Sequence, residues 1–298
     1  MFARPLLAVC LLAATALATE THAIRLLRPV KAGDRFDISA KVAYDDGVTT
    51  TLDGTEVESE KIVAACRLSG VLRVTEVTKK GIPMEIRLKL KTVECVVDGK
   101  PAEFFHADDE LRLRRGEPDN ETQVNGEAAD AVQSQILESL LSVTAENEVT
   151  DEDVFGTADK VEVGAEWPVN AKAAVKALDQ NGVTGLKPEG VKGHAKLVSI
   201  GTLENQPAFS LRMVAEIDGK GVHLASFPEN VKGRRFHSEY AVEMTLPVDP
   251  TSTAGRIKGM AKMEVDAAGT GEVDGKNVEI AMKINRRVAS ELTATPIK

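Results

Sequence analysis

The chain is short of aromatic residues, which make up 4% of its 298 residues, with a single tryptophan and two tyrosines. Carbohydrate-binding surfaces lean on aromatic side chains, so this composition argues against a carbohydrate-binding module. After the N-terminal segment, no stretch approaches 18 consecutive apolar residues, so no membrane-spanning helix is predicted. Positive charge is also in deficit, since the net charge is −9, which disfavours nucleic acid and anionic lipid surfaces as partners.

The motifs of several enzyme classes are missing as well. The five histidines stand apart in the sequence, and neither a His-Glu-x-x-His pair nor a Gly-x-Ser-x-Gly turn occurs. Residues 270–276 resemble a phosphate-binding loop only at their end, Gly275-Lys276. Carboxylates are abundant, but no pair is singled out as an acid and base couple. We therefore predict a protein that is not an enzyme and that needs no cofactor.

The N-terminus has the pattern of a secretory signal. Arg4 precedes a short apolar core at residues 6–17, and residues 16–18 form a small-x-small cleavage signal, with a second possible cut at residue 23. A lipoprotein signal ending at Cys10 is the alternative, although most of the apolar core follows that cysteine. Removal of residues 1–18 takes away Arg4 and changes the net charge to −10 (−9 minus one positive charge). We expect an exported protein, in the periplasm or outside the cell.

The mature chain keeps two cysteines, Cys66 and Cys95, which an oxidising compartment would join as a structural disulfide. Residues 67–78 and 82–96 read as two strands of a hairpin. A two-residue turn at Lys80-Gly81 pairs residues whose numbers sum to 161, which places the cysteines opposite each other. The apolar residues of the two strands match better with a sum of 160, in a three-residue loop with Gly81 left-handed. One bulge between Lys91 and Glu94 reconciles the two registers.

Alternation of apolar and polar residues predicts further strands. The longest covers residues 277–293, which at roughly 3.3 Å per residue reaches on the order of 50 Å and needs a large curved sheet to lie on. One-sided alternation is typical of an antiparallel sheet with one solvated face. The other predicted strands cover residues 35–45, 194–203, 208–217, 236–246 and 256–265.

One segment has helical rather than strand periodicity. Residues 127–144 are predicted as a helix with Asn125 as N-cap and an apolar stripe from Val132 to Leu141, which must pack on a surface such as the sheet. The fold class is therefore α+β, mainly antiparallel β: one or more long curved sheets, or a half-barrel, packed on one central helix. The expected organisation is a signal peptide at 1–18, an N-terminal β half at 24–116, a helical connector at 117–170 and a C-terminal β half at 171–298.

One acidic segment resembles a calcium-binding loop. Asp151, Asp153, Gly156, Asp159 and Glu162 fall at positions 1, 3, 6, 9 and 12 of an EF-hand-type pattern. Phe155 occupies a position where an oxygen ligand belongs, and the following residues are not helical. A solvated acidic linker is therefore the competing interpretation. The four carboxylates are kept as candidate metal ligands.

A glycine and tryptophan motif, Val-x-Val-Gly-x-x-Trp, covers residues 161–167. Together with the export signal, the long alternating strands and the mid-chain helix, it resembles a family of uncharacterised secreted bacterial β-rich proteins. That family in turn resembles the lipoprotein-carrier half-barrels, in which a curved antiparallel sheet wraps a helix and holds acyl chains. The resemblance implies a fold for most of the mature chain, and it transfers no catalytic residues.

Two functions are compatible with these patterns. The first is an exported, non-catalytic binding protein that holds an apolar or acyl-chain ligand between sheet and helix. The second is a structural or interaction module of the cell envelope, with a filled core and a protein partner. Arg286 is of special interest because an arginine on the apolar side of a strand needs a carboxylate, a bulge or an anionic headgroup. The candidate ligand-lining residues are Val132, Ile136, Leu140, Trp167, Tyr240, Met282 and Arg286.

Overall fold

A computed structural model describes residues 20–116, 120–273 and 276–297. Most of the chain is antiparallel β-structure, as the sequence predicts. The strands are β1 (His22–Ala23), β2 (Arg35–Leu52), β3 (Thr55–Val77), β4 (Pro83–Val97), β5 (Lys100–Pro101), β6 (Glu110–Arg114), β7 (Glu121–Val124), β8 (Glu127–Ala128), β9 (Lys160–Val161), β10 (Glu166–Pro168), β11 (Val183–Thr184), β12 (Val191–Leu203), β13 (Gln206–Gly219), β14 (His223–Leu224), β15 (Val231–Pro247), β16 (Gly255–Val273) and β17 (Lys276–Pro296). The helices are α1 (Ala131–Leu140), α2 (Asp151–Phe155), α3 (Ala171–Gln180) and the short 3-10 helix η1 (Pro188–Gly190).

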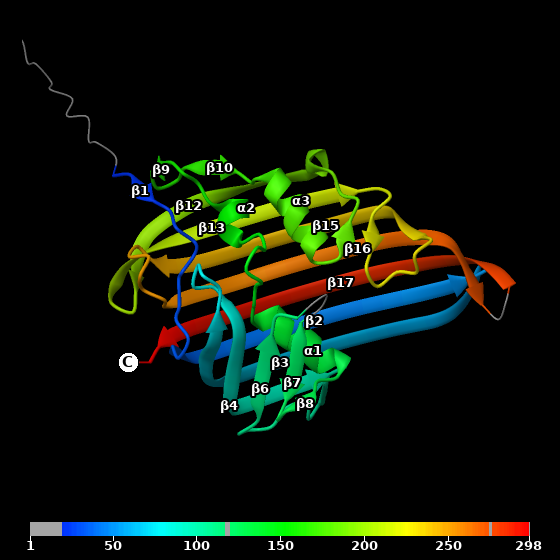
Figure 1. Ribbon diagram of the computed structural model, residues 1–298, viewed down its shortest axis with the longest axis horizontal. Helices are drawn as coiled ribbons and strands as arrows, with labels where there is room; N and C mark the ends of the chain where they lie inside the picture. The colour runs from blue at the N-terminus through cyan, green and yellow to red at the C-terminus, as the bar shows by residue number, and fades with distance from the viewer. Residues whose placement is uncertain (1–19, 117–119, 274–275, 298) are drawn as a thin grey trace, which may run out of the picture.

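One large open sheet dominates the molecule. It has 13 strands in the order β10-β12-β13-β15-β16-β17-β2-β3-β4-β6-β7-β8, with β5 paired to β4. The last long strand, β17, lies near the middle and pairs with β16 on one side and with β2 on the other. The N-terminal and C-terminal strands therefore meet along β2 and β17, as the red and blue arrows side by side in Figure 1 show.

The alternation in the sequence becomes a two-faced sheet. On β2, Phe36, Ile38 and Ala40 are buried, and the residues between them are exposed. On β17 the even-numbered residues are the less exposed ones, with Ile280 and Ile284 buried. The even parity of β17 therefore faces the core, as predicted. The strand runs three residues beyond the predicted range at its C-terminal end.

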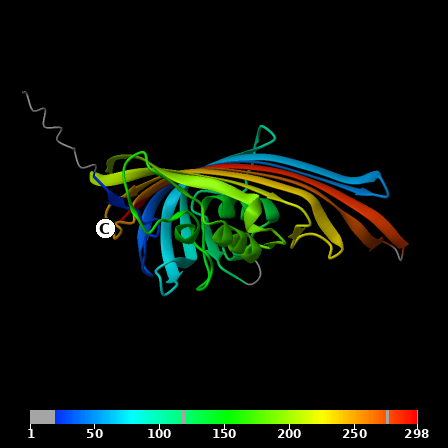
Figure 2. The ribbon, with the colours of Figure 1, turned by 90° about the horizontal axis from the view of Figure 1, so that it is seen from above.

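All three α-helices lie on the concave side of the curved sheet (Figure 2). In Figure 1, α2 and α3 lie in front of the C-terminal strands, and α1 lies in front of β2 and β3. The sequence predicts one central helix, whereas the structure has helices over both halves of the sheet. Among the described residues, none of the helices is long and apolar enough to cross a membrane.

The predicted helix at 127–144 begins later and ends earlier than expected. Asn125 has a φ of 53° and Gly126 a φ of 86°, so this Asn-Gly pair makes the tight turn between β7 and β8 instead of capping a helix. The N-cap of α1 is Asp130, which forms a capping box with Gln133. The Asn-Gly dipeptide is the stronger local signal, because both of its residues tolerate positive φ.

Two apolar cores lie under the sheet. The first is formed by the C-terminal strands with α2 and α3, and the second by β2–β6 with α1. Ile136 and Leu137 of α1 are each 1% exposed, so the apolar stripe packs into the second core. The N-terminal segment, residues 20–34, crosses both cores, since Ile24 packs in the first and Val30 in the second.

Cys66 and Cys95 form a disulfide, as predicted, and are directly opposite each other on β3 and β4. The pairing sum is 161 at the cysteines and 160 from Gly70 to Val74, so the extra residue is Lys91. The loop uses three residues: the Thr78 amide donates to the Ile82 carbonyl, and Gly81 has a φ of 75°. The disulfide closes a loop of 29 residues. It stabilises the fold by about 3–4 kcal/mol, because it restricts the conformations of the unfolded chain.

The predicted domain boundaries do not separate the chain into independent sheets. The predicted signal peptide lies outside the described residues, and a cut at residue 23 would separate β1 from the rest of the chain. The segment 179–193 contains β11 and η1. The predicted β halves, 24–116 and 171–298, contribute to one continuous sheet.

Candidate functional site

The strongest candidate for a ligand-binding site lies at the middle of the concave face, between the two apolar cores. Strand pairing places one inward residue from each of four neighbouring strands in a single row: Tyr240, Ala261, Val288 and Tyr44. The next inward row lies closer to the C-terminal ends of β2 and β16, and it contains Met263, Arg286 and Asp46. Tyr44, Asp46 and Arg286 therefore lie together on β2 and β17, and Tyr240 lies in the same stretch of the sheet on β15.

An apolar cleft of about 380 Å³ opens beside the first row, between the C-terminal end of α1 and strands β15–β17. This volume is at the lower end of the range of about 300–1,000 Å³ that small-molecule sites occupy. Serines 139, 142 and 290 and Glu138 add polar groups to the walls. The apolar lining comes from Leu140, Leu141, Val242, Ile257, Val288 and Leu292.

Arg286 finds the carboxylate that its position requires. Its Nη2 donates to Asp46 Oδ2 at 2.8 Å and its Nε to Asp46 Oδ1 at 3.3 Å, a two-pronged ion pair. The Tyr44 hydroxyl donates to Asp46 Oδ2 at 2.5 Å, and the guanidinium lies 5.8 Å from the centre of the Tyr44 ring. An arginine already held by Asp46 does not need an anionic ligand to neutralise it.

The pKa values in this cluster follow from burial and pairing. Burial raises the pKa of Tyr44, and the hydrogen bond to Asp46 raises it further. For Arg286 burial is the largest influence and would lower the pKa, but the hydrogen bond to Asp46 and the charges of Tyr44 and Asp46 outweigh it, so the pKa is raised. Tyr44 therefore stays protonated as a donor and Arg286 stays charged.

A second polar group lies near the cleft, on α2. The rings of Phe155 and Tyr240 stack with centroids 5.8 Å apart, and Asp151 lies one helical turn before Phe155, on the same face of α2. Burial raises the pKa of Asp151, and the pKa of Tyr240 is raised by burial and then by the charge of Asp151.

Asp151 is exposed to solvent, and the pKa of its carboxyl is raised by the protein atoms that surround it. Among the described residues, no hydrogen-bond donor or cation is found in contact with this carboxyl. Asp151 therefore provides an acceptor on the concave side, next to the tyrosine that lines the cleft.

The seven predicted lining residues have different environments. Leu140 and Tyr240 line the cleft, and Arg286 lies one inward row away from it. Ile136 is fully packed in the second core, Val132 packs at its edge and Met282 packs against the first core. Trp167 is 8% exposed and its Nε1 donates to the Phe155 carbonyl at 2.7 Å, so it anchors α2 as a structural residue.

The other residues that line the cleft were not predicted from the sequence, although the alternation of apolar and polar residues along the strands marks them as inward-facing. Val242, Ile257, Val288 and Leu292 all belong to the inward parity of predicted strands. Asp46 continues the even parity of the strand predicted at 35–45 by one step. Parity identifies the face of the sheet, but only the position of α1 and α2 decides which inward residues are left uncovered.

The predicted calcium ligands do not come together. Asp153 accepts from the Thr150 amide at 2.8 Å in the capping box of α2, whereas Asp151 faces the concave side. Asp159 and Glu162 are exposed in the chain that follows α2. Within the described ranges, these carboxylates do not form a group with metal-binding spacing. The helix is the reason, because its first turn sends neighbouring carboxylates in different directions.

The outer, convex face of the sheet carries a shallow groove of about 540 Å³. A cross-strand row of outward apolar residues runs along it, flanked by charged residues that include Lys41, Arg67 and Glu94. Met260, 52% exposed, and Val96, 40% exposed, are its most prominent members. From β13 to β4 the row consists of Val214, Ala241, Met260, Ala289, Ala43, Ala65 and Val96.

Comparisons with known proteins assign no family to the chain. No protein-family model matches it, and no curated protein matches it. Among solved structures, MucB in complex with MucA(peri) aligns over 84% of this chain and 88% of that chain, with 8% identity and a TM-score of 0.19. The Pseudomonas aeruginosa protein OccK11 (OpdR) aligns over 90% and 99%, with 7% identity and a TM-score of 0.16. Similarity at this level identifies neither a fold family nor a function.

Proposed function

We propose that this chain is an exported, non-catalytic binding protein that holds an apolar ligand, with an acyl chain as the leading class, in the cleft between α1 and the sheet. The observation that carries the proposal is the apolar cleft itself, which opens between two otherwise filled cores. The sequence pattern of a secretory signal and the buried disulfide support export, because disulfides persist in oxidising compartments.

The polar groups beside the cleft narrow the ligand class. Arg286 is neutralised by Asp46, so Arg286 does not offer an uncompensated cation to an acidic headgroup. Asp151, whose charge acts on Tyr240, offers a hydrogen-bond acceptor near the cleft. A ligand with an apolar chain and a hydrogen-bond-donating head, a hydroxyl or an amine, would satisfy both parts of the site.

Variants of the lining test the proposal. Ser290→Phe fills the cleft from β17 without placing a charge in a core, and Leu140→Glu places a carboxylate on its α1 wall. Val163→Glu is the matched control, because Val163 is 51% exposed and far from the cleft lining. Native mass spectrometry of the protein purified under mild conditions reports any co-purifying acyl species, and titration with N-phenyl-1-naphthylamine, an apolar fluorescent probe with an N–H donor and no acidic group, reports affinity.

The expected result is binding by the unaltered protein and by Val163→Glu, and affinity lower by tenfold or more, about 1.4 kcal/mol, for Ser290→Phe. Circular dichroism should show that Ser290→Phe is folded, which keeps the test valid if Leu140→Glu is not. A clean unliganded mass together with no saturable titration by the unaltered protein would exclude the carrier proposal.

The second candidate is an interaction module of the cell envelope without a ligand. The observation that favours it is the outward apolar row, since monomeric proteins normally break such surfaces with charge. Capture of an envelope protein that is lost on Met260→Glu, with no lipid in the cleft, would favour this candidate over the first.

A further inference from the structure

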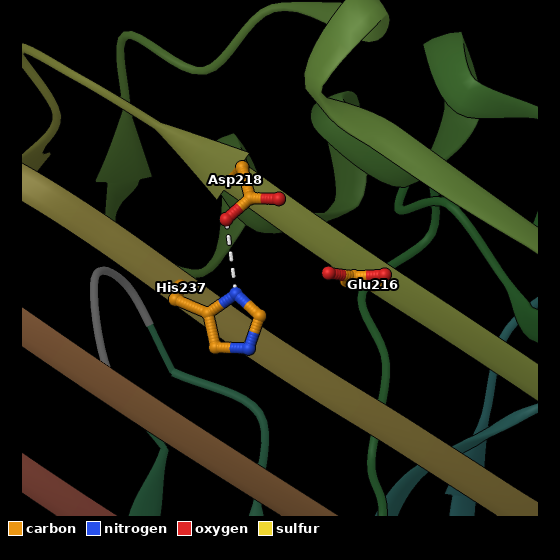
Figure 3. Close-up of side chains that lie close together, drawn as sticks. All are labelled: Glu216, Asp218 and His237. Atoms are coloured by element: carbon orange, nitrogen blue, oxygen red, sulfur yellow. Dashed lines mark hydrogen bonds and ion pairs between the residues drawn. The ribbon is translucent and has the colours of Figure 1, made fainter.

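Two neighbouring strands bring a histidine and two carboxylates together on the outer face of the sheet. Glu216 and Asp218 project from β13, and His237 projects from β15, directly opposite Asp218 in the pairing register. One oxygen of each carboxylate and one ring nitrogen of His237 all lie within 4.8 Å of one another. Figure 3 shows the three side chains converging between the two strands.

The distances are close to those of a metal site. His237 Nδ1 is 2.9 Å from Asp218 Oδ1. Two ligands bound to one zinc ion at about 2.0–2.1 Å in tetrahedral geometry are about 3.4 Å apart, so these two atoms must separate by about half an ångström. Small rotations of the two side chains supply this change, because Asp218 is exposed and the backbone spacing is set by strand pairing.

A supporting carboxylate holds the imidazole from its other side. His237 Nε2 is 3.0 Å from Glu239 Oε1, and Glu239 is in turn 3.9 Å from the Lys262 ammonium. A histidine that binds a metal through one nitrogen commonly donates its other N–H to a carboxylate, which fixes the ring orientation. The ring of His237 is only 13% exposed, so its orientation is already fixed.

The surrounding charge favours a cation. Four carboxylates, Glu216, Asp218, Glu239 and Glu264, neighbour His237 on the outer face. The cations nearby are Lys262, Arg235 and Lys192, which lies opposite Glu216. The hydrogen bonds to Glu239 and then to Asp218 raise the pKa of His237, so a proton is one way of compensating this charge. A divalent ion compensates the negative charge of these carboxylates more fully than a proton on His237 does, and it takes the place of that proton.

We propose that Glu216, Asp218 and His237 form a binding site for a divalent transition-metal ion, with zinc as the best fit. The nitrogen donor separates this class from calcium and magnesium, which prefer oxygen ligands alone. Three protein ligands on an exposed face leave further positions for water or for a donor from a partner. This site lies on the opposite side of the sheet from the cleft and is independent of the proposed ligand.

Isothermal titration of the metal-free, tag-free protein with zinc chloride tests the site, with Co²⁺ absorption as a report on the ligand geometry. We expect one zinc ion per chain, with affinity reduced by at least tenfold in His237→Ala and in Asp218→Asn. Glu239→Gln should weaken binding by roughly 10–100-fold, because it removes the orienting carboxylate. His194→Ala is the matched control, since His194 is an exposed histidine on the neighbouring strand β12.

Competition with protons gives an independent readout. Zinc binds the neutral imidazole, so zinc affinity should fall as the pH is lowered and protons compete for His237, and this dependence should be weaker in His237→Ala. The proposal is overturned if the unaltered protein shows no saturable zinc binding, or if folded His237→Ala and Asp218→Asn bind zinc as the unaltered protein does. Equal losses in His194→Ala and His237→Ala would also overturn it.

Discussion

Arg286 is an inward-facing arginine in the middle of a strand whose other inward residues are mainly apolar. Its partner Asp46 lies directly opposite on β2 and is 9% exposed, so strand pairing and not sequence proximity makes the ion pair. Tyr44 adds a third contact from the same strand. A half-buried pair of this kind is costly to break, because the remaining charge keeps its desolvation cost without its partner.

A double-mutant cycle on this pair provides the prediction at the residue scale. Asp46→Asn and Arg286→Met should each lower the free energy of unfolding by roughly 2 kcal/mol, and the double variant should lose less than the sum of the two. Urea unfolding of the four proteins measures the coupling, expected at about 1 kcal/mol or more. The exposed pair Lys41–Glu291, with N and O 3.4 Å apart, is the control and should couple by less than about 0.5 kcal/mol. Additive effects at both pairs would contradict the argument.

Among the elements, the β3–β4 hairpin shows how one small residue permits a change of register. Gly70 lies where the pairing sum changes from 161 to 160. A Cβ atom on Gly70 would lie 2.3 Å from the Lys89 carbonyl oxygen and 2.9 Å from Leu88 Cδ1. The bulge at Lys91 therefore requires glycine on the opposing strand, because the two backbones approach too closely for any side chain.

Substitution of this glycine gives the prediction at the element scale. Gly70→Ala should lower the free energy of unfolding by about 1–3 kcal/mol, since the methyl group forces the paired strand to shift. Gly201→Ala is the matched control in another long strand, where a Cβ atom meets nothing within 4 Å. Thermal and urea unfolding of the two variants measure the difference. Equal stability of the two would show that the bulge tolerates a side chain.

At the scale of the whole molecule, one large sheet carries the two main cores on its concave side. Stability depends on pH through carboxylates that are paired between its strands. Glu85 on β4 is the clearest case: its Oε2 is 2.6 Å from Arg112 Nη2, and Thr75 and Arg87 contact its other oxygen. The hydrogen bond from Arg112 is the main reason that the pKa of Glu85 is lowered from its ordinary value of 4.5.

Acid unfolding gives the prediction at the scale of the molecule. Because the pKa of Glu85 is lower in the folded than in the unfolded chain, its contribution to stability is complete above about pH 4.5 and is lost as the pH falls through the folded value. We expect stability to decline below pH 4.5, with a shallower decline in Glu85→Gln, which is less stable at neutral pH. Urea midpoints measured from pH 3 to pH 7 test this. An unchanged slope in Glu85→Gln would show that other carboxylates control acid unfolding.

Elements that depend on short-range patterns can be predicted from the amino-acid sequence of this protein. Alternation identified the long strands and their inward faces, and two numerical registers located the disulfide and its bulge. The sequence alone does not distinguish the Asn-Gly turn at 125–126 from a helix cap, because both interpretations use the same polar residues. Tertiary structure alone decided which inward residues stay uncovered, since that depends on where α1 and α2 lie on the sheet. It also brought Asp46 to Arg286 across 240 residues and placed His237 beside Glu216 and Asp218. Pairing between strands that are distant along the chain leaves no periodic signal in either strand, so these clusters become visible only when the sheet is assembled.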